Sequence, residues 1–184
     1  GIARASGKYI NFMNSDDYFA VNEAISLSVK ILEQSNADIS YSDWKQDDRE
    51  VLCRACLPKL FFSMPFCHQT VFCKTSLLRD VGGFCLDYKI AADRHFLFCA
   101  FLQGKRFVKV KTPLAVFHIG GYSSINIEST VAEDYRLFKE FVSPLWRFSE
   151  KELQKCFNFV TLPLPVIHQL TAAQKFTIRC QCYV

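Results

Sequence analysis

The segment Lys8-Tyr9-Ile10-Asn11-Phe12-Met13-Asn14-Ser15-Asp16-Asp17 contains the most informative structural signal in the chain. Residues 8–13 are rich in aromatic and branched side chains, which predicts a short β-strand. Asp16 and Asp17 follow this strand directly, so two adjacent carboxylates are expected at its carboxyl end. In open α/β sheets, ligands bind at that end of the strands.

On the carboxyl-terminal side of this segment, strand and helix patterns alternate along the chain. Helices are predicted over 24–36, 75–81, 91–102 and 128–141, and strands over 38–44, 66–73, 106–110 and 113–118. Residues 45–50 are predicted as a loop or hairpin. The alternation predicts an α/β layered domain over residues 1–142. A further helix opening at 149–152 predicts a helical tail over 143–184.

The composition and the net charge limit the classes of protein to which the chain can belong. The 184 residues are 50% hydrophobic and carry a net charge of +4, which excludes intrinsic disorder and does not indicate a nucleic-acid partner. An uninterrupted run of ~20 apolar residues, as a membrane span requires, is absent from the sequence. The nine cysteines lie mostly in apolar runs and are interpreted as buried thiols. The alternative is a zinc site shared by Cys53-x-x-Cys56 and Cys180-x-Cys182.

The acidic pair Asp16-Asp17 has two interpretations from the residues alone. Adjacent carboxylates suit a hard divalent cation, which neutralises phosphate oxygens. Equally, either side chain could cap the helix that follows. The opening Gly1–Gly7 reads like the end of a helix and not like a start. We therefore expect the chain to be the carboxyl-terminal part of something longer.

Three motifs in register carry a resemblance to a known family. They are A-R-A-S-G-K-Y-I-N-F-M-N-S-D-D over 3–17, the HQ, GGF and AAD groups at 68–69, 82–84 and 91–93, and the strands and serine-bearing loop over 106–123. Together they resemble family 2 glycosyltransferases, which have the GT-A fold and include bacterial polysaccharide-biosynthesis enzymes. Asn14 stands where the family often has Asp, and Cys85 replaces a common Asp.

The resemblance implies a role for each matching residue. Asp93 corresponds to the general base, while Asn14, Asp16, Asp17 and Ser123 would bind the donor nucleotide. Asp16, Asp17 and His118 would hold Mg²⁺ or Mn²⁺. Substrate contacts are expected from His68, Gln69, Gly82, Gly83, Phe84 and Trp44. Structural alternatives stay open: Asp93 as a helix cap, the glycines as a helix stop, His118 and Trp44 as packed side chains, and Ser123 as a turn residue.

The implied fold is a GT-A-type, Rossmann-like mixed sheet flanked by helices and incomplete at its amino end. The implied activity is inverting, metal-dependent transfer of a sugar from a nucleotide-diphosphate donor to an acceptor hydroxyl, in cell-surface polysaccharide biosynthesis. A saccharide or lipid-linked saccharide acceptor and a cytoplasmic site, including peripheral association with the inner face of the membrane, go with this activity. The alternatives are a nucleotidyltransferase of similar fold and a non-catalytic module that binds a saccharide or partner.

Overall fold

The computed structural model describes residues 1–46, 51–61 and 63–142. In these residues, six strands and five α-helices follow one another as β1 (Tyr9–Ile10), β2 (Tyr18–Phe19), α1 (Ala24–Ser35), β3 (Ile39–Gln46), β4 (Val51–Cys53), β5 (Phe72–Lys74), α2 (Thr75–Asp80), α3 (Ala92–Leu102), β6 (Phe107–Phe117), α4 (Tyr122–Ile125) and α5 (Ile127–Leu137). Short 3₁₀ turns lie at Ile2–Arg4, Leu57–Phe61 and His68–Thr70, and a π-helical turn at Phe138–Val142 extends α5.

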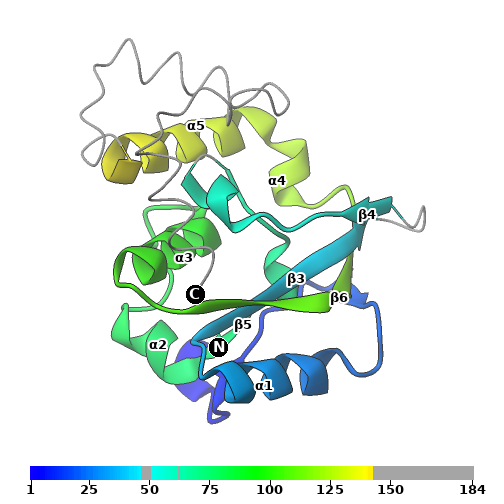
Figure 1. Cartoon of the computed structure of the whole chain (residues 1–184). Helices are drawn as coiled ribbons and strands as arrows, with labels where there is room; N and C mark the ends of the chain where they lie inside the picture. The colour runs from blue at the N-terminus through cyan, green and yellow to red at the C-terminus, as the bar shows by residue number, and fades with distance from the viewer. Residues whose placement is uncertain (47–50, 62, 143–184) are drawn as a thin grey trace, which may run out of the picture.

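The strands form one mixed sheet in the order β1-β5-β3-β6-β2. β3 and β6 run parallel from Ile39 beside Phe107 to Gln46 beside Phe117, and they form its centre (Figure 1). The other pairings are antiparallel, and β4 pairs with the far end of β3. The predicted α/β class is thereby confirmed. Of the loop or hairpin predicted over 45–50, Lys45 and Gln46 instead continue β3, and residues 47–50 lie outside the described residues.

Helices cover both faces of this sheet, and Figure 1 shows β3 and β6 passing between α1 and α3. On one face, Ala24 and Leu32 of α1 are buried with Val110 and Leu114 of β6. On the other face, a larger cluster gathers residues of β3, α2, α3 and the segment 57–66. In the described part of the chain, no helix is long and apolar enough to span a bilayer.

The helices predicted from local sequence patterns before residue 143 are present in the structure. The predicted helices over 24–36 and 91–102 correspond to α1 and α3, and the helix over 75–81 corresponds to α2. α1 ends where Asn36 takes the left-handed conformation, with φ 50°, which Asn tolerates better than most residues. The helix over 128–141 divides into α5 and its π-helical extension. The predicted tail over 143–184 lies outside the described residues.

Four predicted strands differ from the structure, at three places in the chain. The strand over 8–13 pairs only at Tyr9 and Ile10, because the Asn11 side chain donates to the carbonyls of Gln69 and Val71, at 2.9 and 2.7 Å. Residues 66–71 form no strand, since Thr70 N and Thr70 Oγ1 both donate to the Cys67 carbonyl in a tight turn.

The third difference concerns 106–110 and 113–118, which form the single strand β6. Pro113 lacks an N–H and normally interrupts a central strand. Here the β3–β6 register shifts between Ser42 and Trp44. Leu114 N donates instead to Ser42 Oγ at 3.0 Å, so the irregularity accommodates the proline and the strand continues.

Candidate functional site

A cavity of about 390 Å³ opens at the carboxyl ends of β3 and β6. Its walls come from the end of β3, the segment 64–69, the start of α3, and the region of α4 and α5. The structure brings several of the expected site residues to this cavity: Asn14, Trp44, His68, Gln69, Asp93 and Ser123. Residues as far apart as 14 and 123 therefore share one ligand-sized space.

Asp93 and His68 both line the cavity and contact each other. Asp93 lies in the first turn of α3, where its Oδ1 accepts a hydrogen bond from Arg94 N at 2.7 Å. Its Oδ2 lies 3.3 Å from His68 Nδ1. The two side chains are 27% and 30% exposed, so a hydroxyl entering the cavity can reach the carboxylate. A carboxylate oriented by an imidazole is chemically suited to accept a proton.

Both carboxylate oxygens of Asp17 accept hydrogen bonds from other parts of the protein. It is buried, its Oδ1 accepts from His118 N at 2.9 Å, and its Oδ2 accepts from Gln69 Nε2. Cys67 Sγ in turn donates to Gln69 Oε1 at 2.5 Å. Burial raises the pKa of Cys67 to about 12, so the thiol keeps the proton that it donates. Asp17 thereby joins the start of β2 to the end of β6 and to the turn that carries His68.

The structure does not bring Asp16, Asp17 and His118, the expected metal ligands, together around one point. Asp16 is exposed, neither Asp16 nor Asp17 lines the cavity, and His118 also lies outside its lining. The His118 ring lies tilted against the Tyr18 ring, with centroids 5.8 Å apart, and its Nδ1 is buried without a hydrogen-bond partner among the described residues. Within 1–46, 51–61 and 63–142, no group of three His, Cys, Asp or Glu residues could hold a metal ion.

Gly82, Gly83 and Phe84 lie behind the cavity. The two glycines have φ values of 84° and 81° and end α2, where Gly83 N donates to the Leu78 carbonyl at 2.8 Å. The Phe84 ring packs edge-on against Phe12 and Phe96, with centroids 5.0 and 6.0 Å away. Phe84 also borders a small apolar cavity that reaches the undersides of His68 and Asp93. These residues support the wall that carries the pair.

Sequence reasoning missed the contribution of α5 and of Arg94. Arg94 is 1% exposed, pairs with Asp134 Oδ1 at 2.6 Å, and donates to the Leu60 carbonyl through Nε and Nη2. Burial raises the pKa of Asp134 and lowers that of Arg94. Glu133 and Asp134 fall within the helix predicted over 128–141, and the sequence assigned no site role to either residue. Arg94 lies two residues before the apolar run 96–102 in a predicted helix, and a charged side chain so close to an apolar run was the signal that a partner exists nearby.

Sequence comparison relates the chain to glycosyltransferases. No protein-family model matches it. It is 30% identical over 143 residues to uncharacterised glycosyltransferases of two Mycobacterium tuberculosis strains, CDC 1551 and H37Rv, an alignment covering 74% of this chain and 54% of each relative. The chain thus spans about half the length of the curated relatives it matches.

Structural comparison identifies the fold. The mannosyltransferase PcManGT of Pyrobaculum calidifontis, in complex with GDP-Man and Mn²⁺, has a TM-score of 0.60 at 16% identity, covering 98% of this chain and 56% of that one. Staphylococcus aureus TarS 1–349 in complex with UDP-GlcNAc has a TM-score of 0.56 at 16% identity, covering 91% and 55%. The chain therefore has a GT-A-like mixed α/β fold and is related in sequence to glycosyltransferases.

Proposed function

We propose that the protein to which this chain belongs transfers a sugar from a nucleotide-diphosphate donor to an acceptor hydroxyl. The observation that carries the proposal is the cavity in which Asp93, oriented by His68, faces an open space of about 390 Å³. The similar structures are complexes with UDP-GlcNAc and with GDP-Man, which supports a nucleotide-sugar donor. Residues 1–142 are assigned to the catalytic domain in this proposal.

Asp93 acts as the general base in the proposed reaction. As the acceptor oxygen bonds to the anomeric carbon, its proton passes to an Asp93 carboxylate oxygen. The bond from that carbon to the donor phosphate oxygen breaks, and the nucleoside diphosphate leaves with the electron pair. Direct attack from the face opposite the leaving group inverts the anomeric carbon. His68 holds the carboxylate in place through the 3.3 Å contact.

The cavity lining suggests how the substrates are arranged. Trp44 offers an aromatic face on which a sugar ring can stack. Asn14 and Ser123 also line the cavity and supply polar groups for the donor. The acceptor in this proposal is a saccharide or lipid-linked saccharide, as in surface-polysaccharide synthesis.

We also propose that a divalent cation accompanies the donor, because Asp16 is an exposed carboxylate close to Asn14 in the chain and the PcManGT structure is a complex with Mn²⁺. The residues do not form a resident metal site, since both oxygens of Asp17 already accept hydrogen bonds. The chemistry above is therefore assigned to Asp93 and His68 without a step at a metal.

The test is Asp93→Asn in the intact protein. Removing the base is expected to lower kcat about 10²- to 10⁴-fold, measured as nucleoside diphosphate released from UDP-GlcNAc or GDP-mannose in the presence of saccharide acceptors. The matched control is Asp80→Asn at the exposed end of α2, which should keep the wild-type rate. Repeating the assay with Mn²⁺ and with EDTA tests the cation. Full activity of Asp93→Asn would refute the assigned base.

A further inference from the structure

A carboxylate from a distant helix holds the backbone that leads into α3. Glu133 of α5 accepts a hydrogen bond from Lys89 N at 2.9 Å and from Ile90 N and Ala91 N, both at 2.8 Å. The donors lie 42–44 residues earlier in the chain. One side chain therefore satisfies three consecutive N–H groups immediately before the helix that carries Asp93.

The local sequence cannot supply this acceptor. Ala91 is the residue that caps α3, and it makes no side-chain cap hydrogen bond. Helix starts normally use Ser, Thr, Asp or Asn at this position, because an oxygen there binds free N–H groups. Glu133 provides carboxylate oxygens and a negative charge beside the positive end of α3, which is favourable for the helix dipole.

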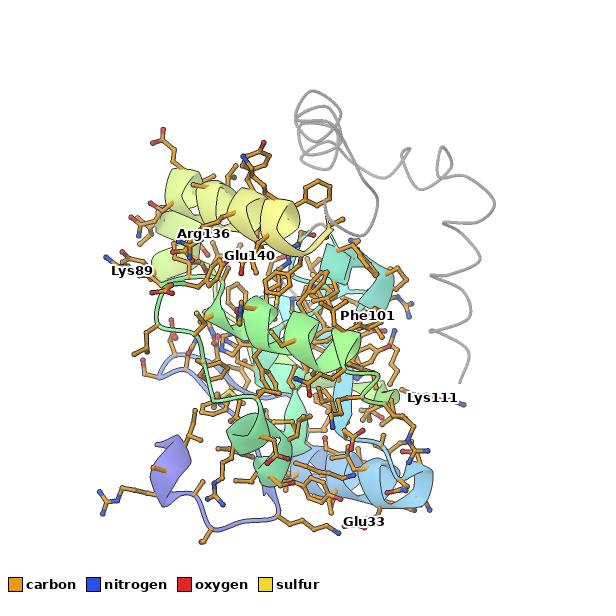
Figure 2. All side chains as sticks on the ribbon, turned by 90° about the vertical axis from the view of Figure 1, so that its left-hand side faces the viewer. Glu33, Lys89, Phe101, Lys111, Arg136 and Glu140 are labelled. Atoms are coloured by element: carbon orange, nitrogen blue, oxygen red, sulfur yellow. The ribbon has the colours of Figure 1, made fainter. Side chains whose placement is uncertain are left out.

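Other side chains of α5 and its extension hold the same segment. The Arg136 guanidinium lies 3.8 Å from the Tyr88 ring centroid, and its Nη2 donates to the Asp87 carbonyl at 2.5 Å. Glu140 accepts from the Tyr88 hydroxyl at 2.6 Å. Figure 2 shows Lys89, Arg136 and Glu140 grouped where α5 meets this segment. The segment 87–91 is thus fixed from one side by α5.

The held backbone is also a wall of the candidate site. Lys89, Ile90 and Ala91 line the same cavity as Asp93, which lies two residues further along. Asp93 and His68 are 3.3 Å apart, so a small displacement of the start of α3 changes that separation directly. Misplacing a catalytic group by about 1 Å costs on the order of 10²-fold in rate.

We propose that Glu133 is a positioning residue, which fixes the backbone of residues 89–91 and through it sets the Asp93 carboxylate against His68 and the acceptor. The inference rests on the proposed function, in which Asp93 is the base. Glu133 itself does not line the cavity, so its effect is expected on kcat and not on donor binding.

The structural half of the test is amide hydrogen exchange in the intact protein. Glu133→Gln replaces one acceptor oxygen by an NH₂ group that faces the backbone donors, so the amides of 89–91 should exchange faster. The matched control is Glu128→Gln, an exposed residue in the first turn of the same helix, which should leave their exchange unchanged. Unchanged protection of 89–91 in Glu133→Gln would overturn the inference.

The kinetic half is a double-mutant cycle. Glu133→Gln alone is expected to lower kcat about 10- to 100-fold with little change in the KM for UDP-GlcNAc or GDP-mannose, whichever donor is used. In an Asp93→Asn background, Glu133→Gln should cause no further loss, because it acts through Asp93. The conservative variant Glu133→Asp, which keeps the charge, should fall between wild type and Glu133→Gln, and it serves as the test variant if Glu133→Gln does not fold.

The two measurements distinguish a failure of the Glu133 positioning role from a failure of the Asp93 base assignment. Equal losses in both backgrounds, or full kcat despite faster exchange, would overturn the positioning role while leaving the base assignment intact. Full activity of Asp93→Asn would instead refute the proposed base, and with it this role. The exchange measurement still reports in that case whether Glu133 holds residues 89–91.

Discussion

Gln69 is the residue that joins the acidic segment to the candidate base. Its side chain is fully buried, its Nε2 donates to Asp17, and its Oε1 accepts from Cys67. Next to it in the chain, His68 lies beside Asp93. The segments around residues 17 and 93 thus contact neighbouring residues of one 3₁₀ turn, and the geometry of the turn affects both.

Gln69→Leu is expected to destabilise the protein by about 1–3 kcal/mol, because the buried Asp17 carboxylate loses a donor and the replacement offers none. Urea denaturation of the intact protein measures the change in free energy of unfolding. Gln34→Leu, at an exposed position of α1, introduces the same side chain without removing a buried contact. Equal stability of the two variants would show that the Gln69 hydrogen bonds contribute nothing net.

Among the elements, α2 ends at a glycine pair for a conformational reason. Gly82 has φ 84°, and a Cβ there would meet no atom within 4 Å. The strain of placing an L-residue in the left-handed region costs roughly 1–2 kcal/mol. Gly82→Ala should therefore lower the free energy of unfolding by about that amount while kcat stays unchanged, because Gly82 does not line the cavity.

The control for this prediction is Gly121→Ala, since Gly121 has φ −65° and free space around it, and its stability should match wild type. Denaturation and steady-state kinetics on the same preparations separate the two possible roles of Gly82. A large loss of kcat in Gly82→Ala without loss of stability would favour the substrate contact that the sequence motif implies.

The contact between α5 and the segment 89–91 should depend on pH. Burial alone raises the pKa of Glu133, but the hydrogen bonds from Ala91 N, Ile90 N and Lys89 N lower it below its ordinary value. A carboxylate whose pKa is lower in the folded state than in the unfolded state stabilises the fold at pH values above its pKa in the unfolded chain, which is about 4.3 for Glu. That stabilisation is lost as the pH falls through the lower, folded value.

The difference in Tm between wild type and Glu133→Gln is therefore expected to be full at pH 7 and to shrink progressively below about pH 4.3. Thermal unfolding followed by circular dichroism across this range measures it, and using the difference cancels carboxylates common to both proteins. A difference that stays constant down to pH 3 would contradict a charge-dependent contact.

On the scale of the whole molecule, Arg94 ties together three separate parts of the chain. From α3 it donates to the Leu60 carbonyl of the turn Leu57–Phe61 and to Asp134 of α5. Arg94→Met leaves the buried Asp134 without its partner, which is expected to cost about 3–5 kcal/mol. Denaturant unfolding measures this loss.

The double variant Arg94→Met with Asp134→Leu tests the cause. Because it removes both buried charges, much of the stability should return, although the Leu60 carbonyl stays without its donor. If the double variant is as unstable as Arg94→Met, then packing around the arginine side chain and the Leu60 contact outweigh the ion pair.

Patterns within about a dozen residues were enough to predict α1, α2, α3 and the mixed α/β class, as well as the place of Asp93 at a helix start. Helices depend on contacts between residues three and four apart, which a single segment contains. The resemblance of the motifs at 3–17, 68–93 and 106–123 also indicated the glycosyltransferase relationship that the comparisons support.

The continuity of β6, the hydrogen bonds of Asp17, and the attachment of 89–91 to Glu133 could not be predicted in this way. Each joins residues from 42 to 101 positions apart, or depends on a neighbouring strand that accommodates Pro113. Such contacts form only when the sheet brings distant segments together, since buried polar groups then take whichever partners the packing provides. Local sequence therefore determined the helices, and the resemblance of its motifs indicated the candidate base, whereas only the tertiary structure decided which carboxylates serve the fold and which face the cavity.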